Sequence, residues 1–196
     1  AEIAAIANNP AAPSFENSLL FAEWQKLHDI HGRTAEAMPA LFKAIGEMKD
    51  PFRRRAFHTA LVAEWAQLDP AAGMKFFFVK GRDGRQRRQF FEEWLKLDAP
   101  AAVDGLLAMG KDWEDFTRDS LKEIARRAPS RLGEVVARLP KPEGYWDTSV
   151  RDAFAMAAAN DLSATLRAAL ALPETNRDQA LAGTVQAWAK SDLQGA

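Results

Sequence analysis

The chain has 196 residues, of which 47% are hydrophobic and 27% are charged, and its formal net charge is −1. These proportions are typical of one folded domain or a short repeat array. The absence of cysteine excludes disulfides, thiolate metal sites and a cysteine nucleophile. No apolar run approaches the roughly 18 residues that span a bilayer. Alanine and leucine dominate and strand-like runs are missing, so the expected fold class is all-α.

The first 49 residues are expected to form an N-terminal helical cap. Ser14 is placed to cap a helix over residues 15–31, and Gly32 is placed to stop it. A second helix then runs to about residue 48, and Pro39 either kinks that helix or makes it start late.

Residues 50–196 carry an internal repeat. A bulky residue recurs at steps of 29, 30, 32 and 32 residues, and an Asp, Asn or Pro follows it four or five positions later. A period near 30 indicates one supersecondary unit, here a pair of helices, repeated along the chain. The bulky anchors are Trp65, Trp94, Ile124, Met156 and Trp188.

The pair Asp69–Pro70 explains how such a unit turns. Asp accepts hydrogen bonds from the free N–H groups of a helix's first turn, and proline fits the first helical position. Proline also disfavours helix at the residue before it, so one helix ends and the next begins within about one residue. The bulky anchor one turn earlier is then expected to wedge between the two helices. We therefore predict structural, buried roles for Trp65, Trp94 and Trp188.

The expected helix pairs are 51–68 with 70–80, 84–97 with 99–109, 113–127 with 129–139, and 149–159 with 161–171, followed by a helix over 176–190. They define repeats at about 51–80, 84–110, 112–139, 149–172 and 176–196. The last repeat is expected to be incomplete, because it stops where its second helix should begin, and we expect the natural protein to continue past Ala196. Further predicted helix-end signals are Asp50, Asp112, Ser149 with Asp152, and Thr175 with Asp178 as N-caps, and Gly81 and Gly110 as C-terminal stops.

Residues with catalytic or metal-binding chemistry are scattered. His28 and His31 lie three apart on one predicted helix, and the third histidine, His58, lies on another. A zinc site needs three or four converging ligands, so we interpret the first two as a surface or helix-end pair. Nucleophile elbows, phosphate loops and dinucleotide motifs are absent. We predict no catalytic residues, no metal site, no cofactor and no enzymatic activity.

The charge distribution is uneven. Residues 49–90 hold ten Lys/Arg and four Asp/Glu, a net of +6, whereas residues 91–120 hold three against eight, a net of −5. Two arginine clusters, at 53–55 and at 82–88, lie at predicted helix N-termini, where the helix dipole disfavours cations. Within these clusters, we take as candidate binding residues Arg53, Arg54, Arg55, Arg85, Arg87 and Arg88.

Two explanations for these arginines stay open. In the first, they pair with acids of the next repeat, namely Asp112, Glu114, Asp115 and Asp119. In the second, they form a ridge that binds an acidic peptide, an anionic surface or a nucleic-acid backbone. Nucleic acid is weakly supported, because the pI near 6.4 is far below that of typical nucleic-acid-binding domains.

The run MKFFFVK poses a similar choice. Its three phenylalanines point in three directions on a helix, so we expect two to be buried and one to lie at a repeat interface. In the alternative, Phe76 or Phe78 anchors a partner beside the arginines.

The motif W-x-x-L-D-P, at its step of 29–32 residues, resembles the alanine-rich tandem αα-hairpin repeats of many bacterial proteins, which are similar to TPR and HEAT solenoids. The resemblance covers about residues 50–196 and implies a protein-binding scaffold without a defined activity. The fixed Gly, Tyr and Pro of the TPR motif at a 34-residue step are absent, so a TPR peptide groove is not implied.

A second resemblance is local. AEIAAIANNPAAPSFENSLL, at 1–20, is similar to the N-terminal helical segment of thimet-oligopeptidase-like metallopeptidases. Those enzymes bind zinc through HExxH, which this chain lacks, so their activity is not implied.

Together these patterns predict a right-handed α-solenoid of stacked αα-hairpins, TPR- or HEAT-like, with an N-terminal helical cap. The expected function is a non-catalytic scaffold that binds a protein or an acidic peptide. The alternative is a HEAT-like binder of nucleic acid or another anionic ligand. No insertion into a membrane is expected, and the sequence favours no compartment and no oligomeric state.

Overall fold

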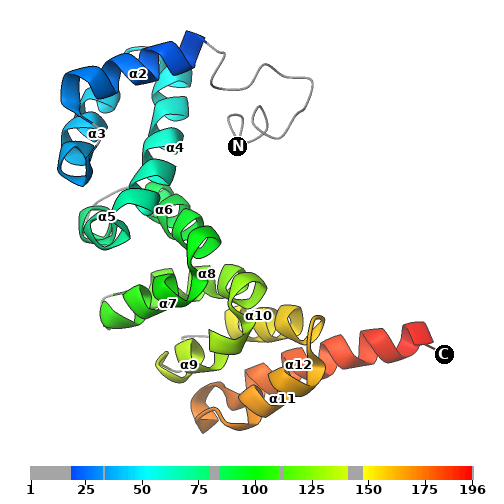
Figure 1. Ribbon diagram of the computed structural model, residues 1–196. Coiled ribbons are helices and arrows are strands. Elements are labelled where there is room, and N and C mark those ends of the chain that lie inside the picture. Colours follow the sequence, from blue (N-terminus) through cyan, green and yellow to red (C-terminus); the bar gives the residue numbers. More distant parts are fainter. Residues whose placement is uncertain (1–18, 33, 80–83, 111–112, 141–147, 196) are drawn as a thin grey trace. The chain divides into compact units, whose positions relative to one another are not determined.

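The computed structural model describes residues 19–32, 34–79, 84–110, 113–140 and 148–195. Throughout these ranges the regular structure is helical and no strand occurs, which confirms the predicted all-α class. The chain divides into two compact units, Ala1–Trp94 and Leu95–Ala196. Figure 1 colours the helices along the sequence.

The first unit begins with two helices joined by a short 3₁₀ turn. Helix α2 (Leu19–His31) ends at Gly32, whose φ of 84° is the left-handed conformation that glycine tolerates best. The 3₁₀ turn η2 (Ala35–Ala37) leads into α3 (Met38–Gly46), and Pro39 sits in the first turn of α3. Proline therefore makes the second helix start late, which was one of its two predicted effects, and Ser14 lies outside the described residues.

The next helices of this unit turn through the predicted acidic corner. They are α4 (Pro51–Leu68), α5 (Pro70–Phe77) and α6 (Gly84–Leu97). The Asp69 carboxylate accepts the N–H of Ala72 at 2.9 Å, while its own N–H donates to the carbonyl of Trp65 at 3.0 Å. One residue thus closes α4 and opens α5. Asp50 caps α4 in the same way, through the N–H groups of Phe52 and Arg53.

Aromatic rings fill the core of the first unit. The centroid of the Trp65 ring lies 4.5 Å from that of Phe76 and 5.3 Å from that of Phe77. The ring centroids of Phe77 and Phe90 are 5.0 Å apart. Gly73 makes the approach of α6 possible, because a Cβ at that position would overlap the ring of Phe90. Trp65 and Trp94 are 1% and 6% exposed, which confirms their predicted burial.

The second unit continues with helices joined by similar corners. The Asp98 carboxylate accepts the N–H of Ala101, and the Asp161 carboxylate accepts the N–H of Ala164. Gly110, just after the helix over Ala99–Ala108, has a φ of 74°, as predicted for a C-terminal stop. The elements are α7 (Ala99–Ala108), α8 (Glu114–Arg127), η4 (Pro129–Arg131), α9 (Leu132–Ala137), α10 (Ser149–Ala158), α11 (Leu162–Leu170) and α12 (Glu174–Gly195).

Small side chains bring the helices of the second unit close together. A Cβ at Gly183 of α12 would overlap the carbonyl oxygen of Arg151 in α10, so only glycine permits this crossing. Asn176 is fully buried, and its Nδ2 donates to the carbonyls of Val136 and Leu139 at 3.1 and 2.9 Å. These bonds join the start of α12 to the end of α9, where helix carbonyls lack intrahelical partners.

Several sequence predictions for the second unit are wrong. No corner forms at Asp192, because α12 runs on to Gly195, and Trp188 is 54% exposed instead of buried. Residue Thr148, not Ser149, is the N-cap of α10, and its side chain makes no capping bond. Thr175 lies inside α12 instead of preceding it. The predicted signals Gly81 and Asp112 lie outside the described residues.

Candidate functional site

The first arginine cluster lies in the first two turns of α4 and is tied to nearby acceptors. Arg53 Nη1 lies 2.9 Å from Glu23 Oε1 of α2, and Arg53 Nε lies 3.5 Å from the capping carboxylate of Asp50. Arg54 Nη1 donates to the Met48 carbonyl at 2.8 Å. These acceptors offset the repulsion between cations and the N-terminal end of a helix dipole.

The second cluster lies in the first turns of α6. The Arg87 guanidinium lies over the ring of Phe78, 5.9 Å from its centroid, a cation–π distance. Asp112 lies outside the described residues, and α8, with the other proposed acidic partners, belongs to the second unit. Pairing of the clusters with the next repeat therefore stays a prediction. The exposed members of the two clusters are Arg53, Arg55, Arg85 and Arg88.

The three phenylalanines of α5 and its end belong mainly to the core. Phe77 and Phe78 are 1% and 6% exposed, so the prediction that two of the three are buried is confirmed. Phe76 is half-buried, and its ring lies 5.1 Å from that of Phe42. Phe78 is thus held beneath Arg87, and only Phe76 keeps part of its ring accessible.

A hollow of about 410 Å³ lies beside Phe76, between the η2–α3 segment and the α4–α5 corner. Glu36 and Lys75 line it together with the edge of Trp65. A hydrogen bond with its own backbone N–H, followed by one with the side chain of Thr34, lowers the pKa of Glu36, so its carboxylate stays ionised. The hollow therefore offers an aromatic wall with two carboxylates, Glu36 and Asp69, and one ammonium group, Lys75.

His28 forms a buried contact that the sequence analysis did not predict. It is 9% exposed, and its Nε2 lies 3.0 Å from Glu64 Oε2 of α4, while Nδ1 lies 3.3 Å from the Gly32 carbonyl. His28 and His31 lie in the last turn of α2, as the helix-end interpretation predicted, but His28 is buried and not a surface residue. Both ring nitrogens therefore lie within hydrogen-bonding distance of protein oxygens. The pair joins α2 to α4. The rings of Trp24 and His28 meet in a T-shaped arrangement, with their centroids 4.7 Å apart.

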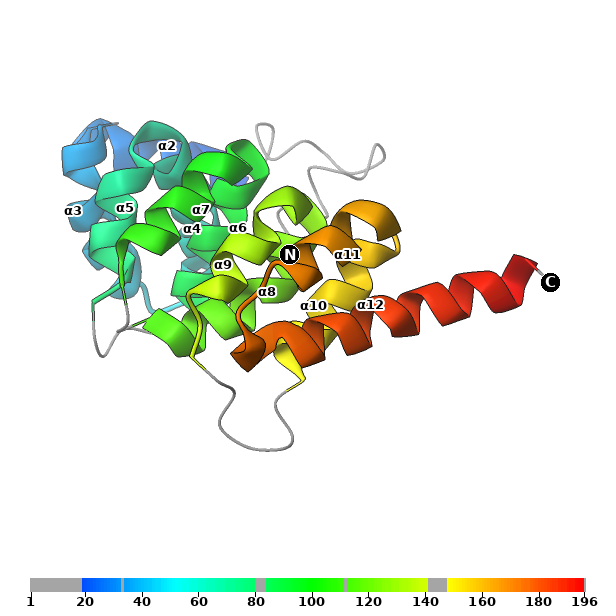
Figure 2. The same ribbon diagram turned by 90° about the horizontal axis from the view of Figure 1, so that it is seen from below.

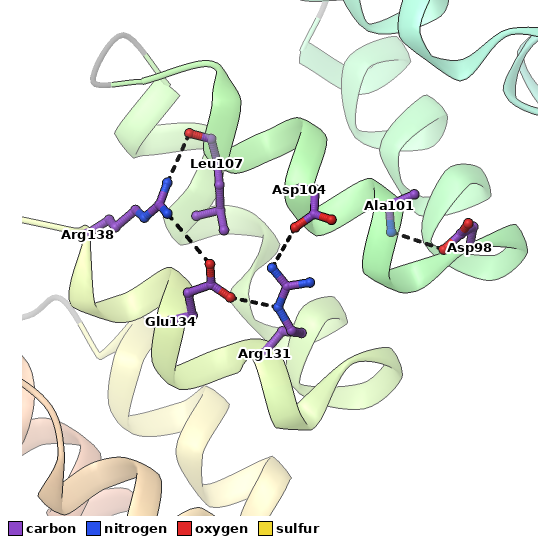
Figure 3. A network of polar contacts seen from close by, with 7 residues as sticks. All are labelled: Asp98, Ala101, Asp104, Leu107, Arg131, Glu134 and Arg138. Carbon is purple, nitrogen blue, oxygen red and sulfur yellow. Dashed lines mark hydrogen bonds and ion pairs between the residues drawn. The ribbon is translucent and has the colours of Figure 1, made fainter.

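A network of charged residues connects α7 with α9 in the second unit (Figure 3). Arg131 Nη2 lies 2.6 Å from Asp104 Oδ1 and Arg131 Nε lies 2.7 Å from Glu134 Oε2. Arg138 reaches the other oxygen of Glu134 and donates to the Leu107 carbonyl. Hydrogen bonds raise the pKa of Arg131 above its ordinary value, and the bond with Glu134 contributes more than the bond with Asp104. The sequence analysis expected inter-repeat ion pairs between the two arginine clusters and the acids of residues 112–119, and it did not identify these residues.

Among the residues that the structure describes, no three His, Cys, Asp or Glu side chains converge as a metal site would require. No helix in the described ranges is both long and apolar enough to cross a bilayer. Comparison with protein-family models, curated proteins and solved structures finds no match to this chain.

Proposed function

We propose that the chain is a non-catalytic helical-repeat scaffold that binds a protein or an acidic peptide. In this proposal the αα-hairpins stack as a right-handed solenoid, related to the alanine-rich tandem repeats of bacteria, behind an N-terminal cap over residues 1–49. The observation that carries it is the recurrence of one acidic corner at Asp69, Asp98 and Asp161. Stacked hairpins present an extended surface, and such surfaces commonly bind other proteins.

The arginines of α4 and α6 are the first candidates for contact. Arg53, Arg55, Arg85 and Arg88 are exposed in the first turns of these helices, and Arg53 also pairs with Glu23 and Asp50. An acidic peptide would meet guanidinium groups able to form paired hydrogen bonds with carboxylates. Phe76 of the same unit keeps part of its ring accessible, whereas the burial of Phe78 favours a supporting role for it under Arg87.

Peptide binding tests this function. We expect short Glu-rich peptides with a central Leu or Phe to bind the chain, and the double variant Arg85→Glu/Arg88→Glu to weaken binding by at least about tenfold through charge reversal. Val79→Ser, an exposed position of the same unit, is the matched control and should bind normally. Equal binding by the charge-reversed variant would contradict an arginine-based site.

The second candidate is a binder of nucleic acid or another anionic ligand, favoured by the same exposed arginines. Phosphate contacts release counterions, so the logarithm of the binding constant for an oligonucleotide would fall linearly with the logarithm of the salt concentration, with a slope of about −0.9 per duplex phosphate neutralised. A shallow salt dependence would exclude this candidate. Turnover of any substrate that His28→Ala abolishes without unfolding the chain would overturn the non-catalytic proposal.

A further inference from the structure

A hollow of about 820 Å³ lies in the second unit, lined mainly by residues of α8, α10 and α12. Lys122 of α8 stands at one side, Met156 and alanines of α10 form the floor, and Trp188 and Lys190 of α12 form the other side. Its volume falls within the range of pockets that hold small molecules or peptide side chains.

The sequence of α10 explains why this space is empty. The segment AMAAAN over 155–160 supplies one methionine among alanines, so the floor has little side-chain volume. Gly183 holds α12 against the beginning of α10, and α12 then continues past the ends of α10 and α11 (Figure 2). Trp188 of α12 lines the hollow together with Met156 and Asn160 at the end of α10.

Trp188 is the feature of the hollow that points to a partner. It is 54% exposed, although Trp65 and Trp94 at the corresponding repeat positions are buried. A large aromatic ring beside an alanine-lined hollow offers apolar area at little conformational cost, and tryptophan is enriched at the energetic centres of protein interfaces.

The charges around the hollow decide which partner fits. The Asp152 carboxylate is engaged, because its Oδ2 lies 3.0 Å from Lys122 Nζ and its Oδ1 lies 3.8 Å from Arg151 Nε. Of the charged residues that line the hollow, Lys122 and Asp152 form this ion pair, and Lys190 supplies the remaining charge, which is positive. The complementary ligand carries an apolar group for the ring and carboxylates for the rim.

We infer that this hollow is a second binding site, for an acidic peptide segment whose Leu or aromatic side chain enters the space between Met156 and Trp188. The inference rests on the proposed function in taking the chain as a peptide-binding scaffold. It adds a separate surface, built from α8, α10 and α12, that the sequence motifs did not indicate.

Fluorescence anisotropy with three sets of short labelled peptides tests the site. The first set has a central Leu or Phe between Glu residues, the second replaces Glu by Lys, and the third replaces the central residue by Ser. Trp188→Ala should weaken binding of the first set by at least about tenfold. Lys190→Glu should weaken the first set and strengthen the second, whereas Val185→Ala, exposed on the same helix outside the hollow, should change neither.

A second measurement reports on the site directly. In ¹⁵N-labelled chain, the indole N–H resonance of Trp188 is identified by its loss in Trp188→Phe, and peptides of the first set should shift it at the concentrations that saturate anisotropy. An unshifted resonance, equal binding by all three sets, or undiminished binding to Trp188→Ala would each overturn the inference.

The outcomes separate this site from the one on α4 and α6. If acidic peptides bind, and only Arg85→Glu/Arg88→Glu weakens them, the proposed function stands and the hollow is not a site. If only Trp188→Ala and Lys190→Glu weaken them, the hollow is the site and the arginine surface is not. If none of the acidic peptides binds the unmodified chain, both proposals fail.

Discussion

The two units turn their helices in the same way and fill the space between them differently. In the first unit, the rings of Trp65, Phe77 and Phe90 separate the helices, and a glycine is needed where a ring approaches backbone. In the second unit, α10 and α12 meet almost backbone to backbone at Gly183, and Asn176 hydrogen-bonds to helix-end carbonyls. A corner of fixed chemistry therefore sets the connectivity, while side-chain volume sets the distance between helices.

The largest effect is expected where a ring fills the core. Trp65→Ala should lower the free energy of unfolding by about 3–5 kcal/mol, because the aromatic cluster cannot collapse to fill the cavity. The matched control is Trp188→Ala, at the corresponding repeat position but 54% exposed, for which a change within about 0.5 kcal/mol is expected. Urea denaturation measures both. Similar losses at the two positions would show that Trp188 is packed after all.

In the second unit, the free energy of unfolding should be most sensitive to side-chain volume added where α10 and α12 cross. Gly183→Ala is expected to cost about 1–3 kcal/mol, because the new methyl group meets the rigid carbonyl of Arg151 and α12 must move. Gly73→Ala should cost less, because the atom it meets belongs to the Phe90 ring, a side chain. Gly46→Ala is the control, since no atom lies within 4 Å of its added Cβ. A neutral Gly183→Ala would contradict the close helix crossing.

The next effect belongs to a polar contact of the second unit. Asn176→Ala should destabilise by about 1–3 kcal/mol, because the carbonyls of Val136 and Leu139 lose their buried donor. Asn176→Asp keeps the shape of the side chain but removes the donor, so it should cost at least as much. If Asn176→Asp were as stable as the unmodified chain at neutral pH, the amide would not be the group that holds these carbonyls.

The shared corner should give equal effects in both units. Asp69→Ala and Asp161→Ala should each cost about 1 kcal/mol, the typical contribution of an N-cap side chain. Asp69→Asn and Asp161→Asn should retain most of the stability, because the amide oxygen also accepts the N–H of the first turn. Unequal losses in thermal or urea unfolding would show that the corner is not the common element of the two units.

The helices and corners could be predicted because their causes lie within a few residues. Asp69 and Pro70 act on the chain immediately beside them, and Gly32 needs only its own conformational freedom. Asp192 shows the limit of this local signal. Leucine follows the acid both at Asp161, where a corner forms, and at Asp192, where α12 continues, so the residue after the acid does not distinguish the two positions.

The contacts that join one hairpin to another could not be predicted in the same way. Asn176 binds a carbonyl 40 residues earlier, and His28 meets Glu64 across 36 residues. Neither partner is marked by local sequence, since any of several carbonyls or carboxylates could face these side chains once the helices stack. The hollow at Trp188 was missed for a related reason, because the same Trp–Asp spacing that predicts burial in the first unit leads to exposure in the second.

The last difference between the units is their response to acid, since all three histidines lie in the first. Burial and then the charge of Arg54 lower the pKa of His58 below its ordinary value of 6.5. The unfolded chain therefore takes up a proton that the folded chain resists, so stability is full above pH 6.5 and falls as the pH drops below it.

His58→Leu should remove this part of the pH dependence. Its free energy of unfolding should fall less steeply below pH 6.5 than that of the unmodified chain, with the change in slope as the readout because the substitution also alters packing against Phe42. In hydrogen exchange below pH 6.5, the difference in protection between His58→Leu and the unmodified chain should appear in residues 34–79. Residues 148–191 lack histidine and should keep the same protection in both chains between pH 7 and the pKa range of carboxylates. If the free energy of unfolding fell with the same slope below pH 6.5 in His58→Leu and in the unmodified chain, His58 would accept its proton as readily in the folded chain as in the unfolded one.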